Sequence, residues 1–187
     1  MNKKTKPMIL GIIGSPRKNG NTEIMIDEVL AGAKDAGAVI DKISLYDLDI
    51  SPCIGCNSCK DNGTCSIKDD MSIVYDKMRE SDVFIMGTPI YYWGPTGQFK
   101  SFFDRLLAAT RQGIIKGKKV ILTIPLGGSE PVARHTVGML TDALNYMSAE
   151  IVAKIVSPST LSTGEVKQKT DKMKSARESG KEVIKNL

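Results

Sequence analysis

The sequence lacks several features that would assign it to particular classes of protein. No uncharged apolar stretch approaches the roughly 20 residues that a membrane-spanning helix needs, and there is no internal repeat, low-complexity tract or linker. Its 187 residues suit one hydrophobic core, because chains of this size seldom divide. We therefore expect a single domain over residues 1–187 and no membrane partner.

Charge of one sign does not form a long run along the chain either. The formal net charge is +5, but the lysines are spread among acidic residues, which is not the clustered pattern of a nucleic-acid-binding protein. The basic opening leads into the apolar run Met8–Ile13, which is too short for a signal peptide and ends at Gly14. We therefore expect a cytoplasmic protein without a nucleic-acid partner. In the reducing cytosol, grouped cysteines indicate metal or redox chemistry more often than disulfides.

Short apolar segments alternate with segments of helical periodicity. Strands are predicted at Met8–Ile13, Val39–Leu45, Val83–Gly87, Val120–Pro125 and Ile151–Val156. Between them, apolar residues recur at i, i+3, i+4 and i+7 from Ile26, Met71, Phe99 and Leu140, which predicts four amphipathic helices. Strict alternation predicts an α/β fold with a doubly wound parallel sheet. The Lys-rich tail over 164–187 is predicted to be helical, either docked on the domain or reaching a partner.

A polar loop follows the first predicted strand and leads into a helix. Helix starts present free N–H groups and the positive end of the dipole, so they stabilise an anion. Donors suited to a terminal phosphate are Ser15, Arg17, Asn19, Asn21 and Thr22. The loop has neither a Gly-Lys-Ser/Thr ending nor G-x-G-x-x-G, which disfavours ATP and dinucleotides. It is therefore a phosphate site, or a polar turn in which Asn21 or Thr22 caps the helix.

Two further loops follow predicted strands at the same edge of the sheet. The segment 88–100 holds the only Trp and two of the five Tyr, and aromatic residues outside a core need a flat partner or a subunit interface. After the fourth strand, small residues over 125–129 let backbone N–H groups approach the polar edge of a ring. Because parallel sheets bind ligands at the carboxyl ends of their strands, three loops converge on one crevice.

Together these motifs resemble the flavodoxin-like NAD(P)H-dependent FMN reductases. Gly14-Ser-Pro-Arg-x-x-Gly-Asn-Thr22 is similar to the family's phosphate loop, and Thr88-Pro-Ile-Tyr-Tyr-Trp-Gly94 with Lys100-x-x-x-Asp104-Arg105 is similar to its flavin-ring segment. The resemblance covers roughly the first 150 residues and implies a five-stranded sheet of order 2-1-3-4-5. It implies that FMN is bound, with the phosphate held by Ser15, Arg17, Asn19, Asn21 and Thr22, and the ring lined by Pro89, Ile90, Tyr91, Tyr92, Trp93, Gly94, Pro125, Leu126 and Gly127.

No catalytic side chain is expected in this site. Asp104 and Arg105 are interpreted as a structural pair, within the helix or tethering a loop. The single histidine, His135, is interpreted as a cap or surface residue, because hydride transfer to a flavin needs no protein acid.

All four cysteines lie within thirteen residues after the second predicted strand, on the loop 46–68. Their spacing is Cys53-x-x-Cys56-x-x-Cys59-x5-Cys65, which lets three thiolates converge on one face of a cluster while the fourth completes a [4Fe–4S] centre. Zinc, free thiols or a disulfide are the alternatives. The spacing also resembles that of the iron–sulfur flavoproteins, a branch of the same family, and this likeness implies FMN plus [4Fe–4S], homodimers or homotetramers, and electron exchange with ferredoxin.

The resulting hypothesis is an FMN-dependent electron-transfer oxidoreductase with a [4Fe–4S] cluster, supplied with electrons by ferredoxin or NAD(P)H. With order 2-1-3-4-5 the second strand lies toward one edge of the sheet, so the cysteine loop after it is expected to project away from the flavin of the same subunit. Electron transfer is then expected between the cluster of one subunit and the FMN of another. The first alternative is an NAD(P)H-dependent flavin, quinone or nitro reductase whose cysteines bind no cluster. The second is a non-enzymatic flavodoxin-like binding module stabilised by zinc.

Overall fold

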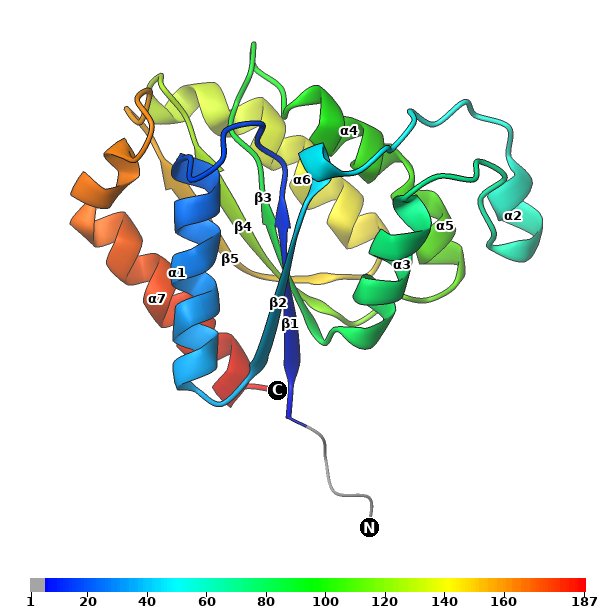
Figure 1. Ribbon diagram of the computed structural model, residues 1–187, viewed down its shortest axis with the longest axis horizontal. Helices are drawn as coiled ribbons and strands as arrows, with labels where there is room; N and C mark the ends of the chain where they lie inside the picture. The colour runs from blue at the N-terminus through cyan, green and yellow to red at the C-terminus, as the bar shows by residue number, and fades with distance from the viewer. Residues whose placement is uncertain (1–5) are drawn as a thin grey trace.

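A five-stranded parallel sheet forms the centre of the protein, whose computed structural model describes residues 6–187 (Figure 1). Its strands are β1 (Met8–Ile13), β2 (Val39–Ser44), β3 (Val83–Gly87), β4 (Lys119–Pro125) and β5 (Glu150–Ser157). They lie in the order β2-β1-β3-β4-β5, with every neighbouring pair parallel. The predicted order is confirmed, and each predicted strand ends within one residue of the observed one. Residues 1–5, which carry the basic opening of the predicted domain, lie outside the described part.

Helices connect the strands and cover both faces of the sheet. They are α1 (Asn21–Asp35), α2 (Ser58–Asn62), α3 (Met71–Glu80), α4 (Gly97–Asp104), α5 (Leu106–Arg111), α6 (Arg134–Tyr146) and α7 (Thr170–Lys185), with short 3₁₀ turns η1 (Leu45–Asp47), η2 (Glu130–Ala133) and η3 (Glu165–Gln168). All four predicted amphipathic helices are present, but the third is divided at Arg105 into α4 and α5. Among the helices of residues 6–187, none combines the length and the apolar character that crossing a bilayer requires.

The sheet separates two apolar cores because successive residues of a strand face opposite sides. In β3, Phe84 packs into the larger cluster, beneath α3, α4, α5 and α6, while Ile85 packs into the smaller one, beneath α1 and α7. All five residues of β3 are buried, as expected for a central strand covered on both faces. The strand ends are therefore held rigidly, and the loops that follow them start from fixed positions.

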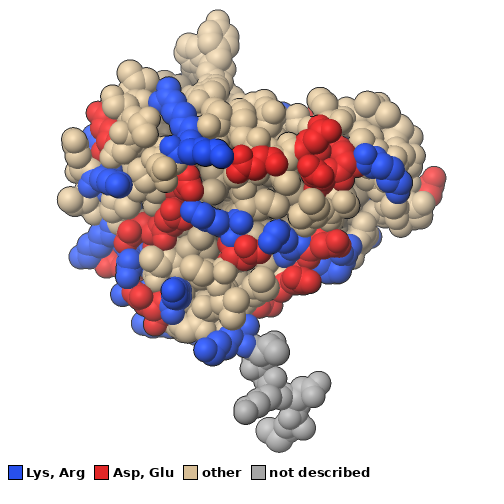
Figure 2. Space-filling view, in the orientation of Figure 1, with Lys and Arg blue, Asp and Glu red and all other residues tan. Residues whose placement is uncertain are grey.

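The carboxyl-terminal helix α7 docks against α1, which decides between the two interpretations of the Lys-rich tail. The two backbones approach so closely that a Cβ at Gly32 would collide with the Arg177 carbonyl, and one at Gly180 with the Val29 carbonyl. Arg177 also bridges to Glu28 at 3.2 Å and to Asp35 at 2.7 Å. Figure 2 shows acidic and basic side chains interspersed over the visible face, in keeping with the spread of lysines along the sequence.

Candidate functional site: a cavity at the strand ends and a cysteine loop

A cavity of about 380 Å³ lies at the carboxyl ends of β1, β3, β4 and β5. It is lined by Ser15, Arg17, Asn21, Thr22, Pro89, Ile90, Tyr91, Tyr92, Pro125, Leu126, Gly127, Thr160 and Leu161. All the residues predicted to bind flavin are among them except Asn19, Trp93 and Gly94. The structure therefore brings the three predicted loops together around one space.

The predicted phosphate end of this cavity is the first turn of α1. The residue that caps the helix is Gly20, and no side chain occupies the cap, so neither Asn21 nor Thr22 has the capping role considered as an alternative. The Ser15 hydroxyl is nearly buried and accepts a hydrogen bond from the Arg17 N–H at 3.3 Å. Uncapped N–H groups, two buried hydroxyls and the positive end of the dipole are features that stabilise an anion.

Two of the predicted phosphate ligands are placed differently from the others. The Asn21 amide donates to the carbonyls of Thr160 and Ser162 at 2.9 and 2.8 Å, and accepts from the Val166 N–H at 3.2 Å. Its side chain thus fastens the loop that follows β5. Asn19 adopts a left-handed conformation, with φ of 54°, and its N–H donates to the Glu23 carboxylate at 2.7 Å, on a neighbouring surface hollow.

The aromatic loop is positioned by two buried threonines. Thr96 caps α4, accepting from the Phe99 N–H at 3.2 Å, and its hydroxyl donates to the Gly14 carbonyl of the phosphate loop at 2.7 Å. The Thr88 hydroxyl accepts from the Thr96 N–H at 3.1 Å. These bonds close the aromatic loop and join its end to the phosphate loop, so the two walls of the cavity are held together.

The tip of the aromatic loop is a tight turn closed by two backbone hydrogen bonds between Tyr91 and Gly94, at 2.8 and 3.0 Å. It projects from the strand ends as the green loop at the top of Figure 1. Tyr92 and Trp93 both have positive φ, at 46° and 67°, which is strained for aromatic residues. Tyr92 is 94% exposed and lines the cavity, whereas Trp93 lies outside it with its ring edge against Tyr92. Such strain is found where a loop must present side chains to a ligand.

The fourth wall of the cavity was not predicted from the sequence. It is the loop after β5, and it contributes Thr160 and Leu161. Leu161 is 70% exposed, although its carbonyl is held by the Arg17 guanidinium at 2.9 Å and its side chain lies against Gly127. Ligands bind at the carboxyl ends of parallel strands, and this rule applies to the loop after the fifth strand as well. The polar sequence of that loop could therefore have indicated that it lines the site.

Asp104 and Arg105 were interpreted as a structural pair, but each forms its ion pair with another residue. Asp104 pairs with Lys100 one turn earlier, at 2.6 Å. Arg105 is only 2% exposed and pairs with Asp69 of the cysteine loop at 2.8 and 3.0 Å. His135 is an exposed residue of the first turn of α6, in agreement with its interpretation as a surface residue.

The cysteine loop projects beside α3 and α5, away from the strand ends (Figure 1). All four thiols are free, with Cys53 and Cys56 exposed and Cys59 and Cys65 partly buried against the larger core. Gly55 and Gly63 have positive φ, which allows the loop to wind tightly. The predicted ligands therefore share one surface loop.

Two of the thiols have perturbed acidities. Contacts of the Cys56 sulfur with the hydroxyls of Ser58 at 3.4 Å and Ser66 at 3.1 Å lower the pKa of this thiol to about 7. Burial raises the pKa of Cys59, and the charges of the other three cysteines raise it further. The four sulfurs are thus close enough to influence one another electrostatically.

The donor set fits a metal centre in its chemistry. Four thiolates are the soft ligands that iron–sulfur clusters and zinc take from proteins. Within residues 6–187, however, no three His, Cys, Asp or Glu side chains stand together as a ready ligand set. Binding a metal centre would therefore require the loop to close further around it.

Comparison with known proteins places the chain in a family context. A family model described as NADPH-dependent FMN reductase matches residues 7–163. An iron–sulfur flavoprotein of Methanocaldococcus jannaschii is 43% identical over 97 residues, which are 52% of this chain and 50% of that protein. Another, from Methanosarcina thermophila, is 37% identical over 121 residues, which are 65% of this chain and 63% of that protein. The chain thus matches half to just under two thirds of the length of these curated relatives.

Solved structures agree on the fold. An NAD(P)H:quinone oxidoreductase from Methanothermobacter marburgensis superposes with a TM-score of 0.74 at 13% identity, covering 96% of this chain and all (100%) of that one. A flavone reductase superposes with a TM-score of 0.73 at 24% identity, covering 95% of this chain and 62% of that one. These likenesses show a flavodoxin-like architecture.

Proposed function

The chain belongs to the NADPH-dependent FMN reductase family, and from this premise we propose that it is an FMN-dependent electron-transfer oxidoreductase with a [4Fe–4S] cluster. Electrons would pass from a ferredoxin-like donor through cluster and FMN to an acceptor, or from NAD(P)H as a hydride directly to FMN. The observation that carries this proposal is the single cavity that joins the phosphate loop, the aromatic loop and the β4 loop. Iron–sulfur flavoproteins among the curated relatives support the assignment of the cysteines.

At the phosphate end, the residues of the chain would bind the terminal dianion of FMN. Uncapped N–H groups of α1 and the hydroxyls of Ser15 and Thr22 supply neutral donors. The Arg17 guanidinium supplies positive charge while one of its nitrogens holds the Leu161 carbonyl. Asn21 would contribute indirectly, because its amide immobilises the fourth wall. We therefore expect the phosphate to supply much of the affinity for the cofactor.

At the ring end, the chain would hold a flat aromatic system and exclude water. One side of the ring would be covered by Pro89, Ile90 and Tyr91. The backbone of Leu126 and Gly127 would face the polar edge of the ring. When bound, FMN supplies two-electron hydride chemistry and one-electron release, and a four-thiolate cluster supplies one-electron transfer. No ionisable side chain lines the ring end among the described residues except Tyr91 and Tyr92, so the chain would bind and orient the ring without supplying an acid.

The separation of the two sites supports an oligomer as the working unit. The cavity lies at the carboxyl ends of β1, β3, β4 and β5, whereas the cysteine loop extends sideways beyond α3 and α5 (Figure 1). We propose a homodimer or homotetramer in which the cysteine loop of one subunit approaches the FMN cavity of another. Two exposed apolar side chains would suit such an interface, Ile54 on the cysteine loop and Leu161 at the cavity.

Anaerobic purification followed by a visible spectrum and by iron, sulfide and FMN analysis tests the proposal. We expect flavin peaks with broad additional absorption near roughly 400 nm. Cys56→Ala should remove the iron and leave FMN bound, and Lys60→Ala on the same loop is the matched control that should keep both. Full iron content in the Cys56 variant would contradict the ligand assignment. Colourless protein that contains zinc and no flavin would identify a non-enzymatic binding module instead.

A second candidate function is a reductase without a cluster. It is favoured by one observation, that the four thiols do not form a ready ligand set within the described residues. In that case NAD(P)H would reduce bound FMN at catalytic speed in iron-free protein, and a quinone, nitro compound or free flavin would be the acceptor. Stopped-flow reduction of the iron-free protein distinguishes the two candidates.

A further inference from the structure

A single buried arginine joins the two ends of the cysteine loop. Arg105 lies at the junction of α4 and α5, and its Nη1 donates to the Ser51 carbonyl at 2.9 Å and to Asp69 Oδ2 at 2.8 Å. Its Nη2 donates to Asp69 Oδ1 at 3.0 Å. Ser51 precedes the first cysteine by two residues and Asp69 follows the last by four. One guanidinium therefore fixes the distance between the two ends of the segment that carries all four thiols.

The carboxylate of Asp69 completes this clamp. It accepts from the backbone N–H of Ser51 at 3.0 Å and from that of Met71 at 3.1 Å, in addition to the two bonds from Arg105. Both side chains of the pair are at most 5% exposed. A buried bidentate pair of this kind has the planar fork geometry that only arginine provides. Lysine at position 105 could keep the charge but could not reach both loop ends at once.

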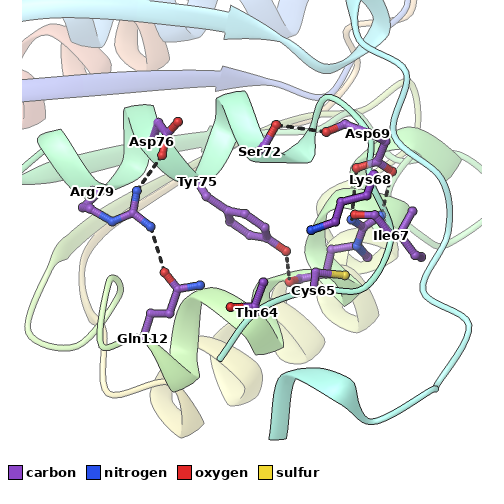
Figure 3. Close-up of a pocket in the computed structure, with 11 residues that line it drawn as sticks. Thr64, Cys65, Ile67, Lys68, Asp69, Ser72, Tyr75, Asp76, Arg79 and Gln112 are labelled. Atoms are coloured by element: carbon purple, nitrogen blue, oxygen red, sulfur yellow. Dashed lines mark hydrogen bonds and ion pairs between the residues drawn. The ribbon is translucent and has the colours of Figure 1, made fainter. Parts of the chain in front are cut away.

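Behind the clamp lies a cavity of about 450 Å³ between the cysteine loop and α3, shown in Figure 3. Figure 3 shows Cys65 beside the hydroxyl of Tyr75, which donates to the Arg105 carbonyl at 2.7 Å. On the far side, Gln112 donates to the Gly63 carbonyl at 2.6 Å. Cys65 is thus the one cysteine that shares a cavity wall with the clamp.

One nitrogen of the clamp is not used. Among the described residues, Arg105 Nε is a buried donor without a hydrogen-bond partner. A buried charged donor left unpaired is costly, so it normally has a partner in the functional state of the protein. Arg105 and Cys65 both line this cavity, so the thiol lies on a wall that the guanidinium also forms.

We propose that Arg105 is a positioning residue for the cysteine loop, which clamps Ser51 and Asp69 together and keeps its Nε–H for the Cys65 thiolate when a metal centre is bound. The second part rests on the proposed function, whereas the clamp itself does not. Sulfur ligands of metal centres are oriented and tuned by such outer hydrogen bonds.

The clamp is tested on FMN-loaded, metal-free, reduced protein by limited trypsin digestion. In Arg105→Lys, cleavage after Lys60 should be about tenfold faster than in wild type, since one charged hydrogen bond is worth about that factor. The matched control is Lys100→Met, which breaks an exposed pair on the same helix and should leave the rate unchanged. Equal rates in Arg105→Lys and wild type would overturn the clamp. If that variant fails to fold, Asp69→Asn carries the same prediction, with circular dichroism and FMN content as folding checks.

The contact to sulfur is tested with Co²⁺ alone, bound to the same metal-free protein under argon. In Arg105→Lys we expect at least about tenfold weaker Co²⁺ binding and a sulfur-to-cobalt charge-transfer band moved to lower energy, because Cys65 has lost a donor. A purely mechanical clamp would weaken binding without moving the band, so an unmoved band would overturn the Nε contact. In a Cys65→Ser background, Arg105→Lys should no longer move the band.

The two failures are distinguishable. Wild-type protein that binds neither Co²⁺ nor iron would overturn the proposed metal centre and the Nε contact with it. The trypsin digestion of metal-free protein would still decide the clamp.

Discussion

Replacing Asn21 by alanine separates two roles for this residue, phosphate ligand and structural fastener. Its amide makes three hydrogen bonds to the segment after β5, buried ones with Thr160 and Val166 and a part-buried one with Ser162. At about 1 kcal/mol each, their loss costs about 3 kcal/mol. Alanine's higher helix propensity offsets about 0.5 kcal/mol of this. Asn21→Ala should therefore lower the free energy of unfolding of FMN-free protein by about 2–3 kcal/mol.

Urea unfolding of the FMN-free protein measures this value, and FMN titration of the folded variant follows. We expect weaker FMN binding as well, because the loop that carries Leu161 loses its fastening. The matched control is Asn19→Gly, which removes a neighbouring amide at a position of positive φ that glycine tolerates and should change unfolding by less than about 0.5 kcal/mol. Unchanged stability of Asn21→Ala with a large loss of FMN affinity would refute the reasoning and restore Asn21 as a direct phosphate ligand.

Three further predictions concern the cofactor, the helix packing and the thiols. Ser15→Ala should weaken FMN binding about tenfold, the value of one hydrogen bond to a charged phosphate, while riboflavin binding stays unchanged in fluorescence titrations; equal losses for both flavins would contradict a phosphate contact. Gly180→Ala should destabilise the protein by about 1–3 kcal/mol through overpacking against the Val29 carbonyl, and an unchanged thermal midpoint would show that α7 is not docked as described. In metal-free protein, alkylation of Cys56 by iodoacetamide should rise with pH around a midpoint of about 7, because the hydroxyls of Ser58 and Ser66 stabilise the thiolate and lower its pKa. The midpoint should move upward in Ser66→Ala, and a midpoint that stays the same would contradict that cause.

The strands were predictable because each signal is local, whereas their order was implied by the family resemblance. A buried parallel strand such as β3 reads as a continuous apolar run, and strict alternation with helices leaves few topologies. The division at Arg105 was not predictable in the same way, because apolar periodicity continues from Phe99 through Leu106. The helix is interrupted where the Arg105 N–H donates to the carbonyl three residues earlier, that of Phe102, at 3.1 Å. The Arg105 side chain there reaches Asp69 of the cysteine loop, 36 residues earlier in the chain.

In the candidate site, too, some residues had local sequence signals and others did not. Residues whose role follows from backbone position, such as Gly127 after β4 or Thr22 at the start of α1, were predicted and line the cavity. Asn21 was predicted as a phosphate ligand from its residue type, but its partners lie about 140 residues away in the sequence, and no local pattern reveals them. Whether the four thiols hold a metal also stays a prediction, because spacing sets which sulfurs can converge but not what they bind.

The most direct test of the cavity as an FMN site is a titration of FMN-free protein with FMN and with riboflavin, followed by flavin fluorescence. One FMN should bind per chain, and riboflavin should bind at least about tenfold more weakly, because it lacks the dianion that the start of α1 stabilises. Folded protein that binds neither flavin, or that binds both equally well, would contradict the account.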